Sequence, residues 1–585
     1  MNKMLGVPLA LSWSLLSACL PNPSGLKTFS DIQDTTVINH LDIPTSLRFT
    51  SKGGVFVTEK SGILRYFKSV GNNQSTVVAD LSKDVYNIWD RGLLSVEVHP
   101  RFPEVPYVYV FYTYDAKIGG TAPAYDDFDN RISSTPGGAS GRLSRLKLAP
   151  QGASYKMIEE KVLIHDWCQV FPSHTVGTVR FGKDGALYAS AGDAAAFDTA
   201  DWGQFENFCN DPLHQGGSLR AQRHAHQSSS VSTLDGSIIR IDSETGNAMP
   251  DNPLVMKEGT LPVGESRVVA YGLRNPYRFN FRPGTNEVWI ADVSWNSWEE
   301  INRIEDPTKL SNFGWPCMEG PNISASWEMM STPVCQALYT ESEKDSNAIK
   351  APYYTYVHST VGKQQLEICP GASGAITGVT FYEKGNFPER FQGALMMADY
   401  VRGCIWAHLP GQNGLPDNSK QELLVKGADS IADLETGPDG NLYYISVVKG
   451  EIHQLSYSPL YDDVTLAEAD DAPIPTITLP AADVYAHARE MITFEGTANT
   501  FEGKPVEEAS LSWRILINHC ADASEWNCHQ HIYQEVTGKN KVTFTMPTDH
   551  SYPSYITATL KSSFFVNGVQ HTSETSRKVS YALTP

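Results

Sequence analysis

The side chains that could do chemistry in this chain are single residues spread along the sequence. His174 stands just before a strand-like run and an Asp-Gly turn, where a histidine serves either as a general base or as a structural residue. Asp193, Asp292 and Asp399 each end a similar apolar run, so a central cluster of carboxylates that binds calcium is conceivable. The chain has no GxGxxG that opens a helix, no P-loop, no HExxH and no GxSxG, which disfavours the enzyme classes that use those motifs.

The elements that must position these residues follow a repeated phrase. It occurs at residues 181–190 and 436–445, where an Asp-Gly pair is followed by an alternating, strand-prone run. An Asp-Gly pair supplies the positive φ that a tight hairpin needs. Looser versions lie at 51–58, 106–113, 283–291 and 391–398. About six such units predict a radial β-propeller, whose inner strands converge on a central cleft.

Composition supports this architecture and limits the partners. The chain has 585 residues, of which 41% are hydrophobic, with 45 Gly and 35 Pro. This length suits a large propeller plus a second module, and the glycine and proline content suits turn-rich β structure. The net charge of −20 argues against nucleic acid or an anionic membrane surface as a partner.

The N-terminus predicts export. Residues 1–19 carry one positive charge and a short apolar run, which is typical of a signal peptide and too short for a membrane span. The phrase Leu16-Ser-Ala-Cys19 resembles a bacterial lipobox, in which Cys19 would be acylated and would anchor the protein. Leu20 then favours the outer membrane. The alternative is an ordinary secretory signal whose small residues merely suit a peptidase.

The remaining cysteines predict disulfides. Eight are left after Cys19, none in a CxxC pair, and an even number in an exported chain favours disulfide pairing. We expect a local bridge between Cys520 and Cys528 and another between Cys317 and Cys335. The other expected pairs are Cys168 with Cys209 and Cys369 with Cys404.

The chain divides into two predicted domains. An acidic, proline-punctuated stretch separates the propeller pattern from short alternating strands typical of an immunoglobulin-like sandwich. The histidines beside Cys520 and Cys528 could form a metal site, but a disulfide-closed hairpin explains them as well. We expect this module to be a spacer or an adhesion module. The predicted fold is all-β: signal peptide 1–19, linker 20–36, six-bladed propeller 37–457, acidic linker 458–474 and sandwich 475–585.

Six phrases go beyond a generic propeller pattern. They are residues 90–100, 173–177, 234–242 with 250–253, 271–278, 298–303 and 312–316. In this order they resemble the glucose/sorbosone dehydrogenase family. That family consists of six-bladed propellers and includes soluble quinoprotein sugar dehydrogenases and the propellers of Hedgehog-interacting-type proteins. The resemblance extends to Leu455.

The resemblance implies a sugar oxidation chemistry. A base takes the proton of the anomeric hydroxyl while hydride passes to pyrroloquinoline quinone, and Ca²⁺ polarises the quinone carbonyl. His174 matches the base. Ser173 stands where the glucose-oxidising members carry Asp, so the residue that orients the imidazole would be missing.

The resemblance also implies cofactor contacts. Asp90, Arg274, Asn275 and Arg402 would contact the quinone, although Arg274 could instead bridge to an inner carboxylate and Asp90 could belong to a surface ion pair. The metal would be held by the backbone carbonyls of two adjacent residues, Ser294 and Trp295.

Three positions depart from the glucose enzyme. Val401, Ser430 and Ala432 replace a lysine and two arginines, which removes charge pairing for the three carboxylates of the cofactor. We therefore predict an exported quinoprotein sugar or aldose dehydrogenase, or alternatively a cell-surface binding propeller that kept the fold and lost the cofactor. A sugar lactonase is a minor alternative. The predicted partners are a small sugar or a surface glycan, and no electron acceptor is indicated.

Overall fold

The computed structural model consists mainly of β-strands. It describes residues 32–125, 138–197, 199–205, 208–223, 233–255, 264–323, 326–359, 368–371, 373–457, 473–480, 484–499, 504–520, 528–547, 554–566 and 569–582. Across these ranges, no helix has both the length and the apolar character needed to cross a membrane. The chain divides into two compact units, residues 1–458 and 459–585.

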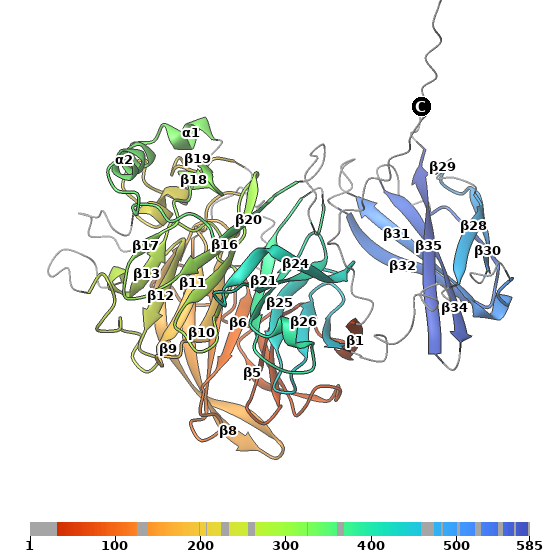
Figure 1. The fold of residues 1–585 in the computed structure, drawn as a ribbon, viewed down its shortest axis with the longest axis horizontal. Coiled ribbons are helices and arrows are strands. Elements are labelled where there is room, and N and C mark those ends of the chain that lie inside the picture. Colours follow the sequence, from red (N-terminus) through yellow and green to blue (C-terminus); the bar gives the residue numbers. More distant parts are fainter. Residues whose placement is uncertain are drawn as a thin grey trace, which may run out of the picture. The chain divides into compact units, whose positions relative to one another are not determined.

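The first unit is a propeller of six antiparallel four-stranded sheets (Figure 1). The blades, from the inner strand outward, are β2 (Pro44–Phe49), β3 (Val55–Glu59), β4 (Ile63–Phe67), β5 (Ser75–Asp80); β6 (Leu93–Val98), β7 (Tyr107–Tyr114), β8 (Ala139–Gln151), β9 (Ser154–Gln169); β10 (Val176–Phe181), β11 (Leu187–Ala191), β12 (Ser237–Ile241), β13 (Val268–Tyr271); β14 (Arg278–Phe281), β15 (Val288–Asp292), β16 (Trp298–Ile304), β20 (Tyr354–Val357); β21 (Ile376–Tyr382), β22 (Ala394–Asp399), β23 (Cys404–Pro410), β24 (Pro416–Lys426); β25 (Ile431–Thr436), β26 (Leu442–Ser446), β27 (Glu451–Tyr457), β1 (Ile32–Ile38).

Short elements decorate the third and fourth blades and their loops. Strand β17 pairs in parallel with β13, and a small hairpin and two short helices follow it. These elements are β17 (Ser311–Asn312), β18 (Met318–Glu319), β19 (Asn322–Ile323), α1 (Trp327–Met330), α2 (Pro333–Ser342) and the 3₁₀ turns η1 (Gly217–Gln222), η2 (Glu265–Arg267) and η3 (Glu389–Phe391).

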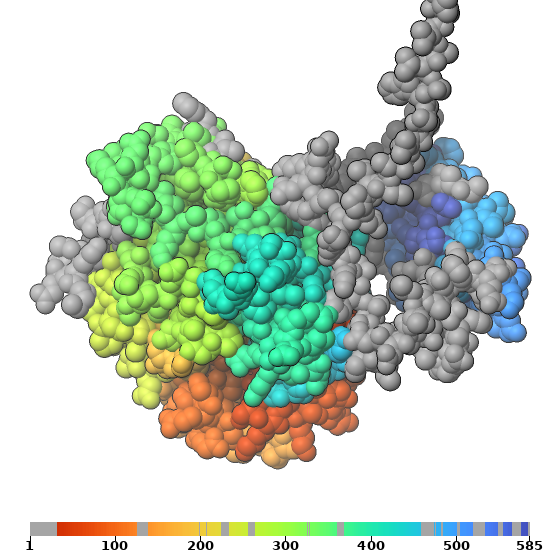
Figure 2. Space-filling model, viewed as in Figure 1, coloured from red at the N-terminus to blue at the C-terminus, as the bar shows by residue number. Residues whose placement is uncertain are grey.

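The ring closes by joining the two ends of the unit. Strand β1 pairs antiparallel with β27, so the N-terminal segment supplies the outer strand of the last blade. It begins five residues before residue 37, where the sequence pattern placed the start of the propeller. The inner strands β25 and β2 are also in contact. In Figure 2 the orange-red surface of the first blade accordingly meets the blue-green surface of the last blade. This closure fixes the inner strands around one axis.

The repeated Asp-Gly phrases form the predicted hairpins. Gly185 lies between β10 and β11 with φ of +81°, and Gly440 lies between β25 and β26 with φ of +80°. In both turns the aspartate before the glycine accepts a hydrogen bond from a tyrosine on the next strand, Tyr188 to Asp184 and Tyr443 to Asp439. The same phrase therefore specifies the same hairpin in the third and the sixth blade.

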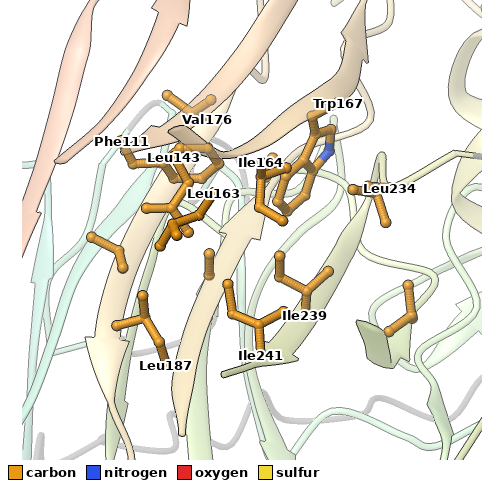
Figure 3. Close-up of a cluster of buried hydrophobic side chains, with 14 of the residues drawn as sticks. Phe111, Leu143, Leu163, Ile164, Trp167, Val176, Leu187, Leu234, Ile239 and Ile241 are labelled. Atoms are coloured by element: carbon orange, nitrogen blue, oxygen red, sulfur yellow. The ribbon is translucent and has the colours of Figure 1, made fainter. Parts of the chain in front are cut away.

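Apolar side chains fill the space between neighbouring blades. Figure 3 shows the cluster between the second and third blades, which takes residues from strands β7 to β12. Trp167 is fully buried in it, so replacing this side chain with alanine would cost about 3–5 kcal/mol. The other labelled members are Phe111, Leu143, Leu163, Ile164, Val176, Leu187, Leu234, Ile239 and Ile241.

The second unit is the predicted immunoglobulin-like sandwich. Its two sheets enclose a core that contains Phe494, Trp513 and Phe544. Strand β33 alternates between exposed and buried residues, as expected for a sheet with one solvated face. The strands are β28 (Ile474–Leu479), β30 (Met491–Asn499) and β33 (Lys541–Thr545) in one sheet, and β29 (Val484–Ala486), β35 (Val569–Tyr581), β34 (Tyr555–Val566), β31 (Leu511–Cys520) and β32 (Cys528–Thr537) in the other, with the 3₁₀ turn η6 (Glu508–Ser510).

Three of the predicted disulfides are confirmed. They join Cys168 to Cys209, Cys317 to Cys335, and Cys369 to Cys404. Cys520 and Cys528 are opposite each other in the register of β31 and β32, but their side chains lie outside the described part of the structure, so that bridge stays a prediction. Cys19 also lies outside the described residues.

Candidate active site

A cleft with a volume of about 860 Å³ opens at the centre of the propeller. Every blade contributes a residue from the start of its inner strand, which places the cleft on the propeller axis. These residues are Thr45, Leu94, Val176, Tyr277, Thr377 and Ala432. The location agrees with the expectation that the inner strands converge on the site.

His174 forms a hydrogen-bonded dyad with Asp193 in the wall of this cleft. Its Nδ1 lies 2.8 Å from Asp193 Oδ1, and Trp315 Nε1 donates to the other carboxylate oxygen at 2.7 Å. The aspartate and the tryptophan thus fix the plane of the imidazole. Since an ionised carboxylate only accepts hydrogen bonds, Nδ1 carries the proton and Nε2 is free to accept one. His174 can therefore act as a base.

Asp193 is held in its charged form. Burial alone would raise the pKa of this carboxyl, but His174, Arg274 and the Trp315 donor outweigh burial and lower it. The sequence-based concern about a missing orienting residue is wrong. Ser173 is not needed for that role, because its hydroxyl donates to Ala195 O at 2.7 Å while Asp193 orients the ring.

The backbone around the dyad is under tight constraint. His174 has a φ of +50°, a region that non-glycine residues rarely occupy and that is often found at functional sites. Gly192 separates β11 from Asp193, and a Cβ there would lie 2.5 Å from His174 O and 2.9 Å from Arg274 O. Only glycine fits this position, so the close packing of the two strands depends on it.

Asp90 supports the histidine from the opposite side. Its Oδ2 accepts the His174 backbone N–H at 3.1 Å, and its backbone carbonyl accepts the Thr175 hydroxyl at 2.9 Å. Asp90 also lines the cleft, as expected for a residue near a ligand. Arg91, in contrast, is buried and donates to the carbonyls of Gln169 and Val170.

Arg274 and Asn275 reach the cleft from the segment before β14. The Asp292 carboxylate accepts both of their backbone N–H groups, at 3.1 Å and 2.7 Å. Both residues line the cleft, and the Arg274 guanidinium lies 5.6 Å from the Trp315 ring centroid. The structure therefore brings His174, Asp90, Arg274 and Asn275 together.

The expected calcium position is taken by Arg274. Its Nη1 donates to Ser294 O at 2.7 Å and to Val293 O at 3.1 Å. Glu319 fixes the same loop by accepting the backbone N–H groups of Trp295 and the two residues after it. With the guanidinium on the Ser294 carbonyl, a calcium ion at Ser294 and Trp295 does not fit this arrangement.

The three strand-ending aspartates do not form a shared cluster. Asp193 serves His174, Asp292 serves the backbone of residues 274 and 275, and Asp399 accepts the Tyr356 hydroxyl and three backbone N–H groups. Within the described residues, no group of three or more His, Cys, Asp or Glu side chains could hold a metal ion. The hypothesis of a central calcium cluster is therefore wrong for this part of the chain.

Arg402 does not reach the cleft as a cofactor ligand. Its side chain is 1% exposed, and its guanidinium donates to the carbonyls of Val357, His358, Cys369 and Ser373. The geometry gives Arg402 a bracing role in the wall of the cleft, in place of the cofactor contact that the resemblance implies.

Lys60 is a cleft cation that the sequence did not reveal. Its Nζ donates to Asn87 Oδ1 at 2.7 Å, and it lines the cleft near Asp90. Burial lowers the pKa of Lys60 to about 8, and Asp90 partly offsets this effect. Lys60 and Arg274 thus place two cations in the cleft, which suits a ligand that carries carboxylates.

Aromatic rings line the entrance of the same cleft. Trp89, Phe197 and Trp295 all lie on its surface, and Trp89 is 53% exposed. The Trp89 and Phe197 ring centroids are 6.4 Å apart, and Trp295 Nε1 donates to Phe197 O. Exposed rings of this kind stack on the apolar faces of sugars. The sequence gave no sign that they would gather here, because they come from three separate loops.

Together the fold and the site define a six-bladed β-propeller with a histidine–aspartate base and two cations in an axial cleft. Residues 41–454 match the model of the family described as glucose/sorbosone dehydrogenase. The chain therefore belongs to the glucose/sorbosone dehydrogenase family, as its sequence motifs indicated.

Individual relatives agree with this assignment. The chain is 22% identical to the aldose sugar dehydrogenase YliI of Escherichia coli over 414 residues, which span 69% of this chain and 87% of that protein. It is 23% identical to an uncharacterised protein of Synechocystis, over 71% of this chain and 84% of that protein. A crystal structure of a glucose dehydrogenase, 19% identical, superposes with a TM-score of 0.51 over 73% of this chain and 100% of that chain, which supports the fold.

Proposed function

We propose that this protein oxidises an aldose at its anomeric carbon, with His174 as the general base and a carboxylated quinone, pyrroloquinoline quinone, as the hydride acceptor. The observation that carries the proposal is the His174–Asp193–Trp315 arrangement in the wall of the axial cleft. Family membership and the name of the Escherichia coli relative support it.

The residues of the cleft divide the work of the reaction. Asp193 holds the proton of His174 on Nδ1, so that Nε2 can accept the proton of the anomeric hydroxyl. Removing that proton makes hydride departure from the same carbon easier. The buried Asp193 carboxylate then stabilises the imidazolium that forms.

The cations fit the proposed cofactor. Lys60 and Arg274 would pair with its carboxylates, and Asn275 would hydrogen-bond its ring substituents. When bound, a quinone of this kind supplies an electrophilic carbon that accepts hydride. The aromatic surface of Trp89 and Phe197 would hold the sugar ring at the entrance.

The proposal differs from the family pattern in its use of metal. Because Arg274 already donates to the Ser294 carbonyl, we propose that activity does not require calcium at this loop. The guanidinium would supply positive charge where a metal would otherwise lie.

Reconstitution tests the function. The purified protein is incubated with pyrroloquinoline quinone, with calcium or with a chelator, and dye reduction is measured with a panel of aldoses. We expect quinone-dependent turnover that His174→Gln lowers by about 10²–10⁴-fold. The matched control is His165→Gln, because His165 is an exposed histidine on β9, far along the chain from the dyad. Absence of quinone binding by calorimetry would reject the enzyme and leave a binding propeller.

We also propose that the protein is exported and anchored by acylation of Cys19. The support is the sequence alone, Leu16-Ser-Ala-Cys19 after a short apolar run. Mass spectrometry of the N-terminal peptide from the membrane fraction should show a lipid on this cysteine. Cys19→Ser should release the protein from the membrane, whereas an ordinary secretory signal would give a soluble product from both variants.

A further inference from the structure

A second histidine lines the same cleft and forms a separate chain of hydrogen bonds. His358 Nδ1 lies 2.9 Å from Glu299 Oε1, and His358 Nε2 lies 2.9 Å from the Ser373 hydroxyl oxygen. Both His358 and Ser373 are part of the lining of the cleft. A serine, a histidine and a carboxylate connected in this order have the geometry of a nucleophilic triad.

The burial of the three side chains suits those roles. The Glu299 side chain is 0% exposed, and its second oxygen accepts the Ile376 backbone N–H at 3.1 Å, so the carboxylate cannot turn away from the histidine. The His358 side chain is 20% exposed, and Ser373 is half-buried. The carboxylate is thus enclosed while the hydroxyl remains accessible from the cleft.

Arg402 holds the histidine and serine segments together. Its guanidinium donates to the backbone carbonyls of His358 and Ser373, and also to that of Cys369, whose side chain forms the disulfide with Cys404. This arginine was expected to contact a cofactor. Its observed contacts instead fix the separation between two segments that lie on opposite sides of the masked residues 360–367.

The serine segment is also packed tightly against the glutamate. A Cβ on Gly374 would lie 3.2 Å from Glu299 Cγ and 3.3 Å from Asp399 Oδ2. Gly374 therefore allows the residue after the serine to approach the carboxylates closely. Such close support keeps the serine–histidine distance within hydrogen-bond reach.

We propose that Ser373, His358 and Glu299 hydrolyse a cyclic ester of a sugar, a lactone, bound in the axial cleft. The triad geometry is independent of the proposed oxidation, but the choice of a sugar lactone rests on it. Oxidation of an aldose at the anomeric carbon gives a lactone, and the triad lies in the cleft where that product would form.

The step balances with water as the co-reactant. His358 Nε2 takes the proton of the Ser373 hydroxyl as its oxygen attacks the lactone carbonyl carbon. The bond from that carbon to the ring oxygen then breaks, and His358 returns the proton to this oxygen, which leaves an ester on Ser373. Water attacks the ester with His358 as base, and the open-chain sugar acid is released with the serine regenerated.

Two assays without quinone test the proposal apart from the dehydrogenase. The full-length protein is treated with a fluorophosphonate probe, and the labelled peptide is identified by mass spectrometry. Hydrolysis of glucono-δ-lactone is followed at constant pH against the rate in buffer. We expect an adduct on Ser373 and a rate above the buffer rate, and we expect Ser373→Ala to remove both.

Matched variants separate catalysis from stability. Ser419→Ala makes the same change at an exposed serine of β24 and should keep the labelling and the hydrolysis. Glu299→Gln should slow labelling at least ten-fold while Glu299→Asp keeps most of it, a pattern that a purely structural glutamate would not give. Lactone hydrolysis at the buffer rate, or equal rates for wild type and Ser373→Ala, would overturn the proposal even if the protein proves to be a dehydrogenase.

Discussion

Replacing Asp193 with asparagine isolates the role of the dyad in the proposed oxidation. The substitution keeps the size of the side chain and removes its charge. One oxygen of Asp193 now accepts the Trp315 indole N–H at 2.7 Å, and the other lies 2.8 Å from His174 Nδ1 and accepts the Ala195 N–H at 3.1 Å. An amide cannot accept hydrogen bonds on both sides.

Both orientations of the new amide are harmful. If its NH₂ group faces His174, the imidazole must accept on Nδ1, and Nε2 then carries the proton and cannot serve as a base. If its NH₂ group faces Trp315, two donors meet and the indole loses its partner. In either case the imidazolium loses the buried negative charge that stabilises it.

The expected loss follows from the work assigned to the base. A positioned general base contributes about 10²–10⁴ in rate, which corresponds to roughly 3–5 kcal/mol of activation free energy. We therefore expect Asp193→Asn to lower kcat by about 10³-fold. KM and the affinity for the quinone should change little, because the cations that would bind the cofactor are untouched.

Steady-state kinetics and calorimetry of the reconstituted protein measure both quantities. Adding Trp315→Phe removes the indole donor and lets the amide oxygen face His174, so the double variant should regain part of the lost kcat. A kcat for Asp193→Asn within ten-fold of the wild type, with the variant fully folded, would refute the assignment of the dyad.

Three further predictions concern charges around the cleft. Because the pKa of Lys60 is about 8, quinone affinity should fall as the pH rises through about 8, and Lys60→Met should bind more weakly with no such dependence in calorimetric titrations. Arg402→Lys cannot reach all of its carbonyl partners, so chemical denaturation should show a loss of about 3 kcal/mol; an unchanged unfolding midpoint would contradict the bracing role. Burial alone would raise the pKa of Asp433, but Arg48 and Arg278 hold it below the usual value, so this group stabilises the fold above about pH 4 and the stabilisation disappears as the pH falls further. Asp433→Asn should therefore flatten the acid limb of a plot of Tm against pH, and an unchanged limb would refute that assignment.

The fold was predictable because its signals are local. An Asp-Gly turn between alternating strands specifies a hairpin wherever it occurs, so the phrases at 181–190 and 436–445 revealed the repeat. The cysteine pairs followed from an even count and short separations. Strand β1 was harder to place, because its pairing with β27 joins the two ends of the propeller.

The site was only partly predictable because its contacts cross blades. His174, Arg274 and Asp90 could be located from motifs, but no motif links Asp193 to Trp315, which is 122 residues away. The fate of Arg402 depended on four carbonyl groups, and carbonyl positions leave no trace in residue identity.

The most direct test of the proposed oxidation is the anaerobic reduction of bound quinone by an aldose, followed by absorbance in a single turnover. The account predicts that the quinone is reduced, that deuterium at the anomeric carbon slows the reduction, and that His174→Gln slows it by at least 10²-fold. A quinone that binds in the cleft but is not reduced by any aldose, or is reduced equally fast by His174→Gln, would contradict the account.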